Sequence, residues 1–259
     1  MASVSTPASV FRAIVRGRRS TRRFQRDKFI DDYILKEILE SSLRSPSSFN
    51  LQPTHIIMVQ NPSLKEKVAE TCMLGLGNQY RTRDAPVLAV FLSDLEVTKR
   101  VSRIEKLEKN QRDPNYLNML PIASSFLAGE GHAALLVKQA ATDFLSYQYD
   151  KSMPCIEPVQ AWSYKNTGII AQTYVLAATS HGLGTCIMEG MDGRKIKELL
   201  RVPDRYAVPL AIATGYEYLE EDNNDTKEVH TPRLPINEVC FGDSFGVPLT
   251  FTEEASTKE

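Results

Sequence analysis

The sequence predicts an α+β domain in which short core strands are interrupted by long helices. Three runs rich in β-branched and other apolar residues are typical of buried strands, and they lie at 54–60, 85–93 and 206–217. Long segments with helical periodicity separate them, without the regular strand–helix alternation of a parallel sheet. Of the 259 residues, 42% are hydrophobic and 24% are charged, which is enough apolar material for a substantial core.

The N-terminal half is expected to begin with two short helices. Apolar residues recur at helical spacing within 8–16 and again from Asp31 onwards. The stretch "SPSSFNLQP" (45–53) has the composition of a turn and leads into the first strand. The stretch "SLKEKVAETCML" (63–74) predicts a helix before the second strand.

The C-terminal half is expected to be more helical. Residues 99–161 are predicted to be mostly helical, and 164–184 to form a long apolar helix that ends at a glycine. "TCIMEG" (185–190) predicts a further strand, and "DGRKIKELLRVPD" (192–204) a short amphipathic helix. The last forty residues, rich in proline and acids, are expected to form an extended arm.

Composition and motifs disfavour several classes of function. No window approaches the roughly 18 apolar residues that a membrane helix needs, so no membrane partner is predicted. "GLGNQY" (75–80) and "GLGTCI" (182–187) each lack the third glycine of a dinucleotide fingerprint. The cysteines are far apart and share no ligand spacing with the histidines, so we expect reduced thiols and no metal site. These cysteines are Cys72, Cys155, Cys186 and Cys240.

An arginine cluster near the N-terminus stands out in a chain of net charge −1. "RGRRSTRRF" (16–24) places five arginines around one Ser-Thr pair. Residues 1–30 carry eight bases and one acid, whereas 216–259 carry eleven acids and three bases. A nucleic-acid arm, a targeting peptide, a solvated face and an anion pocket are the alternatives. The near-neutral net charge gives no sign of a basic face on the folded body, so we predict no nucleic-acid partner.

Three segments suit parts of an anionic, planar ligand that forms hydrogen bonds. The arginines, with Ser20 and Thr21, could bind a phosphate through charge-assisted bonds. The turn at 45–53 offers the amides of Asn50 and Gln52 to a ring edge, and "MEGMD" (188–192) allows close backbone approach. Taken singly, each segment is equally well explained as a surface charge or a structural connector.

The order of the segments resembles that of the FMN-dependent nitroreductase family. The matching stretches are "RRSTRRF", "SPSSFNLQP", "NQYRTRDAP", "KNTGIIAQTYVLAATSHGLGTCIMEGMD" and "RLP". They extend from about Arg16 to Pro235, and the resemblance is weaker between Glu96 and Ala161. The resemblance implies a three-layer α+β fold with a mostly antiparallel central sheet flanked by helices. It also implies an interlocked homodimer with FMN at the interface. One domain over 1–259 is expected, with a variable helical lid at about 99–161 and an extended arm at about 217–259.

The resemblance implies which residues hold the phosphate end of FMN. Arg18, Arg19 and Ser20 would contact the phosphate and the ribityl chain, helped by Arg233 from the arm. Some members carry a lysine two residues before the tail arginine, where this chain has Thr231. The arginines would therefore neutralise the phosphate.

The flavin ring would be held by both chains. Arg22 and Arg81 would reach the pyrimidine edge, with Asn78 beside them. Glu189 and Gly190, after Met188, would border the opposite face, with their N–H groups near flavin N5 and O4. The partner chain would supply four residues that pack on the ring and bond to it, Pro46, Ser47, Ser48 and Asn50. A common version of the family has an aromatic residue where Thr54 follows Pro53 here, so the local packing must differ.

The resemblance implies an NAD(P)H-dependent oxidoreductase that reduces quinones or nitroaromatics by a two-electron, ping-pong route. No acid or base side chain is needed, because hydride passes through the flavin. A dehalogenase-like or specialised flavin chemistry, or a flavin-binding protein without turnover, are the alternatives. The lid aromatics could stack on a substrate or simply pack between helices. They are Tyr116, Phe144, Tyr147 and Tyr149.

We expect a cytoplasmic protein. The first 26 residues are rich in Ser and Arg and lack acids, as transit peptides do. Cleavage after the arginines would remove the implied cofactor site, which limits any organellar presequence to about ten residues.

Overall fold

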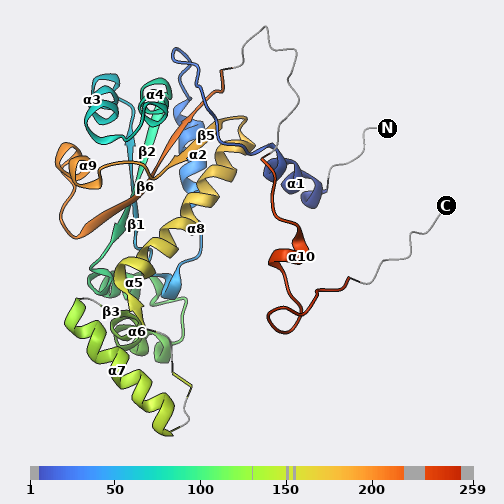
Figure 1. The fold of residues 1–259 in the computed structure, drawn as a ribbon. Coiled ribbons are helices and arrows are strands. Elements are labelled where there is room, and N and C mark those ends of the chain that lie inside the picture. Colours follow the sequence, from blue (N-terminus) through green and yellow to red (C-terminus); the bar gives the residue numbers. More distant parts are fainter. Residues whose placement is uncertain (1–5, 130, 150–151, 154–155, 219–230, 252–259) are drawn as a thin grey trace. The chain divides into compact units, whose positions relative to one another are not determined.

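The computed structural model of the chain describes residues 6–129, 131–149, 152–153, 156–218 and 231–251. The chain divides into two units, Met1–Leu219 and Glu220–Glu259. The first unit contains the sheet and its covering helices (Figure 1). In the second unit, the described residues form the short helix α10 (Ile236–Val239) and a bridge between Phe241 and Pro248. A single domain spanning 1–259 remains a prediction.

Four strands form the central sheet in the order β1-β2-β6-β5. Every neighbouring pair is antiparallel, which confirms the predicted mostly antiparallel sheet. The strands are β1 (Thr54–Val59), β2 (Val87–Asp94), β5 (Gly184–Met188) and β6 (Tyr206–Gly215). All four correspond to runs that the sequence predicted as strands.

β6 runs through Pro209, a residue that cannot donate a backbone hydrogen bond. The register with β2 shifts between Phe91 and Ser93, opposite this position. On the other side of β6, the pairing with β5 ends at Ala211. The irregularity therefore falls where the ladder lacks a regular partner for residue 209, so the proline is tolerated.

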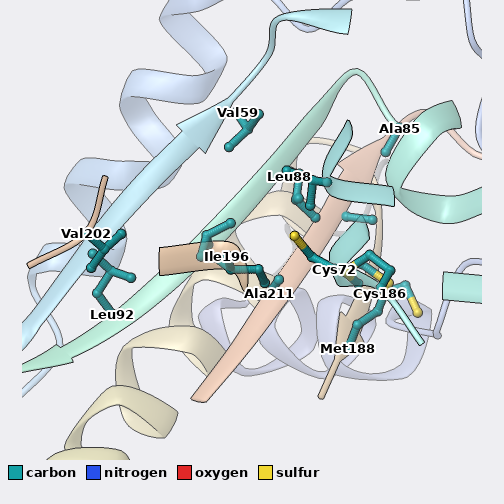
Figure 2. Packing of buried hydrophobic residues seen from close by; sticks show 14 of the residues in the cluster. Val59, Cys72, Ala85, Leu88, Leu92, Cys186, Met188, Ile196, Val202 and Ala211 are labelled. Carbon is teal, nitrogen blue, oxygen red and sulfur yellow. The ribbon is translucent and has the colours of Figure 1, made fainter. Parts of the chain in front are cut away.

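Helices cover both faces of the sheet and complete three layers (Figure 1). One face packs against α2 (Asp32–Leu43) and α8 (Val159–Ser180). The other packs against α3 (Pro62–Cys72) and α9 (Gly193–Leu200). All eight residues of β2 are buried because alternate side chains enter the two cores. Figure 2 shows the second of these cores, where Leu88 and Leu92 lie among Cys72, Ile196 and Ala211.

The remaining elements include one helix that the sequence did not predict, α4 (Leu76–Asp84). The predicted first helix is present as α1 (Pro7–Gly17). The described parts of 99–161 are mostly helical, as expected, and α8 already begins within that range. The described elements in and next to this range, the predicted lid, are η2 (Val97–Arg100), α5 (Val101–Glu108), α6 (Pro114–Leu127), α7 (His132–Tyr149) and the paired strands β3 (Ala128–Gly129) and β4 (Glu157–Pro158).

The predicted glycine stop of the long helix is confirmed. Gly182 has a φ of 71°, and its N–H donates to the carbonyl of Thr179 at 2.9 Å. The N–H of Leu183 donates to the carbonyl of Ala178 at 3.0 Å. These two bonds satisfy carbonyls at the end of α8 and direct the chain into β5.

The buried carboxylate of Asp94, at the end of β2, contacts residues at the start of the predicted lid. Asp94 is fully buried and accepts hydrogen bonds from Arg205 Nε at 3.1 Å and from the backbone N–H of Glu96 at 3.0 Å. Arg100 Nη1 lies 3.6 Å from the same carboxylate and 3.4 Å from Nδ1 of His55. Burial, with a smaller contribution from the Arg100 charge, lowers the pKa of His55. The folded environment therefore favours the neutral form of the imidazole.

Candidate functional site

The arginine segment, residues 18–25, is held as an extended strip against the sheet. Ser20 pairs with Thr185, and the N–H of Thr21 donates to the carbonyl of Thr185 at 2.8 Å. Further along, Phe24 pairs with Glu217. The cluster is therefore held by backbone pairing with β5 and with the chain that follows β6.

The charges of this segment are only partly compensated. The guanidinium of Arg19 binds the carboxylate of Glu217 through two contacts, of which Nε to Oε1 is 3.2 Å. Among the described residues, Arg18, Arg22 and Arg23 have no ion-pair partner. Three cations are thus available to an anionic ligand.

A cavity of about 330 Å³ adjoins the Arg19–Glu217 ion pair. Thr21 lines it together with residues of α1 and the end of α8. Thr21 is fully buried, and within the described part of the chain its hydroxyl oxygen has no hydrogen-bond partner. An unpaired buried hydroxyl beside a cavity is able to accept a polar ligand.

A second group of predicted residues meets after β5. Asn78 Nδ2 donates to the carbonyls of Leu74 at 3.1 Å and Gly190 at 3.2 Å, and Arg81 Nη1 donates to Asn78 Oδ1 at 3.3 Å. A Cβ at Gly190 would lie only 2.8 Å from Asn78 Nδ2, so a larger residue would displace the Asn78 amide from its present hydrogen bonds. The Nε of Arg81 is buried without a partner among the described residues. This group therefore retains a donor for a ligand.

β5 connects the two groups. Ser20 pairs at Thr185, near the start of the strand, and Gly190 follows two residues after its end. Five residues of extended chain span about 16 Å. Met188 is buried in the core, whereas Glu189 is exposed. An elongated ligand with an anionic end and a hydrogen-bonding ring fits this arrangement of cations, hydroxyls and amides, and FMN is such a ligand.

The turn at 46–50 is preformed and is separate from the two groups of residues described above. Phe49 and Asn50 have φ values of 53° and 52°, which are strained for residues other than glycine. The N–H of Ser48 donates to Asn166 Oδ1 at 2.9 Å, and Asn50 Nδ2 donates to Glu108 Oε1 at 2.8 Å. The hydroxyl of Ser47 accepts from the N–H of Gln52. The turn is therefore preformed, bonded to α8 and to the lid helix α5.

One chain does not bring this turn to the arginine segment. The turn leads into β1, and the arginine segment pairs with β5, on the opposite edge of the sheet. Three strand spacings of about 4.8 Å amount to about 14 Å. Pro46, Ser47, Ser48 and Asn50 thus keep the partner-chain role implied by the resemblance as a prediction.

Two residues of the site were not found from the sequence. Glu217 binds Arg19 across 198 residues, and the only sequence signal was the excess of acids near the C-terminus. Glu108 binds Asn50 from within the charged helix α5, where nothing in the sequence distinguishes it from the neighbouring charged residues. Arg233 lies in the second unit, where its guanidinium donates to the carbonyls of Thr231 and Pro232. Its predicted role at the phosphate remains untested.

The lid aromatics lie in several environments. Phe144 and Tyr147 are 60% and 92% exposed, and Tyr116 carries the guanidinium of Arg112 over its ring at 5.3 Å. The side chain of Tyr149 lies outside the described set. Exposed rings on a lid are able to stack on a substrate.

Two further properties bear on the class of protein. In the ranges that the structure covers, no helix has the length and apolar character to cross a membrane. Among the same residues, no three His, Cys, Asp or Glu side chains gather into a metal-binding group.

Comparison with known proteins identifies related sequences and folds. The model of the Nitroreductase family matches residues 15–216. A protein of Thermus thermophilus named NADH dehydrogenase is 28% identical over 199 residues, which are 77% of this chain and 82% of that protein. A nitroreductase family protein of Streptococcus pneumoniae has a similar structure, with a TM-score of 0.67 at 22% identity over 90% of this chain and 99% of that one. An FMN complex of a protein from Exiguobacterium sibiricum has a TM-score of 0.67 at 19% identity, covering 93% and 99% of the two chains.

Proposed function

Because the chain belongs to the Nitroreductase family, we propose that it transfers two electrons from NAD(P)H through FMN to a quinone or nitroaromatic acceptor. A single observation carries the proposal. The arginine segment and the Asn78–Arg81–Gly190 group lie at the two ends of one strand, at a spacing that suits an elongated flavin nucleotide.

The residues present define how FMN would be held. Arg18 and Ser20 lie at the start of β5 and would bind the phosphate and the ribityl end. Arg22 and Arg81 would reach the pyrimidine edge. The backbone of Gly190 would border the ring, where its carbonyl already fixes the amide of Asn78. When bound, FMN supplies the ability to accept a hydride from NAD(P)H and to return two electrons to an acceptor.

The protein contributes charge and position to this reaction. Arg81, which is half-buried and has an unpaired buried Nε among the described residues, would stabilise negative charge at the pyrimidine end of a reduced flavin. The cations of the arginine segment neutralise the phosphate. Donor and acceptor would use the same open face in turn, which gives ping-pong kinetics without an acid or base side chain.

A homodimer would complete the site. The turn at 46–50 is preformed but lies on the opposite sheet edge from the arginine segment, so a second copy would have to present it. α1 buries none of its residues, and it leaves Val10, Phe11 and Val15 exposed by 44–57%. An exposed apolar stripe next to the arginine segment is typical of a surface that another chain covers.

The first test is an absorption spectrum of the purified protein, repeated without oxygen after addition of NADH or NADPH. Flavin bands that bleach with the reductant and return with the quinone menadione are the expected result. A colourless protein that also refuses added FMN would refute the proposal. A yellow protein that neither bleaches nor turns over would favour a flavin-binding role instead.

The second test removes the phosphate contacts. The double substitution Arg18→Gln with Ser20→Ala is expected to release FMN while the protein remains folded and dimeric. Lys36→Gln, at an exposed position of α2, removes the same charge and is expected to keep the flavin. Full FMN occupancy in the double variant would show that the arginine segment is not the phosphate site.

A further inference from the structure

We propose that Arg19 does not bind the flavin phosphate but positions the arginine segment through its ion pair with Glu217. The pair is called here the Arg19–Glu217 clamp. This inference rests on the proposed function, because it assigns roles within the same flavin site.

The geometry of the clamp is that of a two-point contact. The guanidinium of Arg19 meets both carboxylate oxygens of Glu217, Nε to Oε1 at 3.2 Å and Nη2 to Oε2. A fork-to-fork contact fixes the orientation of both groups, which a single contact does not. The two side chains are 50% and 24% exposed, so the pair is partly shielded from water.

The clamp continues a short region of backbone pairing between the arginine segment and the chain that follows β6. The N–H of Gln25 donates to the carbonyl of Tyr216 at 2.9 Å. The N–H of Tyr218 donates to the carbonyl of Arg23 at 3.0 Å. The side-chain amide of Gln25 adds a bond to the carbonyl of Glu217 at 2.9 Å. These bonds hold the C-terminal end of the segment. The clamp holds its N-terminal end to the same piece of chain.

The extended segment separates two sets of side chains. Arg19 and Thr21 line the 330 Å³ cavity together with Glu217, whereas Arg18, Ser20 and Arg22 are not among the described residues that line it. Alternate side chains of an extended chain point to opposite sides. Arg18 and Ser20, which would bind the phosphate and the ribityl end, are therefore on one side of the segment, and the clamp is on the other.

Charge balance points the same way. The carboxylate of Glu217 neutralises Arg19, and it would repel a phosphate bound at that guanidinium. On the opposite side, Arg18 and Arg22 have no such counter-charge among the described residues. The clamp thus holds the segment in place without reducing the charge that faces the ligand.

The two roles for Arg19 predict opposite effects of Glu217→Gln. If Arg19 bound the phosphate, removal of the competing carboxylate would tighten FMN. If the clamp positions Arg18 and Ser20, its loss would raise the FMN dissociation constant, by about fivefold for a partly exposed pair. The charge-swapped double variant R19E/E217R rebuilds the clamp, so it is expected to restore FMN binding to within about twofold of the wild type.

The measurement is the dissociation constant of FMN, obtained by diluting the purified holoenzyme and following flavin fluorescence. The same titration after exchange into riboflavin, which lacks the phosphate, separates positioning from general destabilisation. We expect Glu217→Gln to weaken FMN by a larger factor than riboflavin, because only FMN has the phosphate that Arg18 would bind. Glu40→Gln, which breaks an exposed pair with Lys36 on α2, is the control and should change neither constant.

Three outcomes would overturn the inference. These are tighter FMN binding in Glu217→Gln, a parallel loss of FMN and riboflavin, and a charge-swapped variant that binds FMN no better than Arg19→Gln. None of them touches the proposed function, which fails instead if the wild-type protein holds no flavin.

Discussion

The contact between Gly184 and Thr21 is expected to be the most sensitive point of the arginine segment. A Cβ at Gly184 would lie 2.3 Å from the hydroxyl oxygen of Thr21 and 3.1 Å from its Cβ and Cγ2. Thr21 is fully buried, and its backbone N–H is bonded to Thr185 at 2.8 Å, so it cannot withdraw without breaking the pairing. Gly184→Ala is therefore expected to lower the free energy of unfolding by about 1–3 kcal/mol, as overpacking does.

A double-mutant cycle separates this contact from other effects of the alanine. Thr21→Ala removes both the hydroxyl and the methyl group that the new Cβ would meet. Since that hydroxyl has no partner in the described structure, its loss breaks no hydrogen bond, and the lost methyl costs about 1 kcal/mol. In this background Gly184→Ala should cost about 1 kcal/mol less than in the wild type.

The assay is equilibrium unfolding in urea for the wild type, both single variants and the double variant. Gly193→Ala is the matched control, because its Cβ would meet Val208 at 3.7 Å, an ordinary contact. Strictly additive effects in the cycle would refute the close approach as the cause. So would equal costs for Gly184→Ala and Gly193→Ala.

Two further predictions concern Asp94 and His55, which lie next to the start of the predicted lid. Asp94→Asn removes the buried carboxylate that accepts from Arg205 and is expected to lower the free energy of unfolding by about 1–3 kcal/mol, because Arg205 is 29% exposed and stays partly hydrated. His55 has a lowered pKa, so its neutral form is preferred in the folded state. Its contribution to stability is complete above about pH 6.5 and is lost as the pH falls below that value through the lowered pKa. His55→Gln should therefore flatten the decline in the urea midpoint on the acid side of pH 6.5.

Each of these predictions has a control. Asp204→Asn breaks an exposed pair with Lys197 and should change stability by less than about 1 kcal/mol, so an equal effect of Asp94→Asn would contradict the assigned burial. For His55, His181→Gln is the comparison, because His181 lies 3.4 Å from a carboxylate, that of Glu37, whereas His55 lies next to Arg100. An unchanged pH profile in His55→Gln would show that another group causes the decline.

Periodicity predicted most of the sheet and its covering helices. β1, β2 and β6 are runs in which neighbouring apolar residues enter two cores, and such runs are easily recognised. α4 was not predicted, because "LGNQYRTRD" is polar and only its Thr82 is buried. The helix is stabilised by tertiary contacts with α3, which local sequence does not reveal. The strands β3 and β4 were not predicted either, because strands of two residues show no periodicity.

The site was less accessible from sequence than the fold. Gly190 and Asn78 are 112 residues apart, and no spacing rule joins them. The family resemblance implied that both border the flavin, whereas their direct contact is a finding of the structure. Glu217 was hidden for a different reason. An excess of charge indicates that counter-charges must exist, but it does not say which acid meets which arginine.

The order of the strands explains why one chain leaves the predicted site divided. The arginine segment pairs with β5, whereas the turn at 46–50 leads into β1, and β2 and β6 lie between these two strands. Within one chain the turn is already bonded to Glu108 and Asn166, so it is an ordered surface and not a loop that must fold on contact. A second copy that presented this turn to β5 would lose little conformational entropy on binding. The exposed apolar side chains of α1, next to the arginine segment, would give that copy an apolar area to bury. Assembly and cofactor binding would then stabilise one another, because both act on the same edge of the sheet.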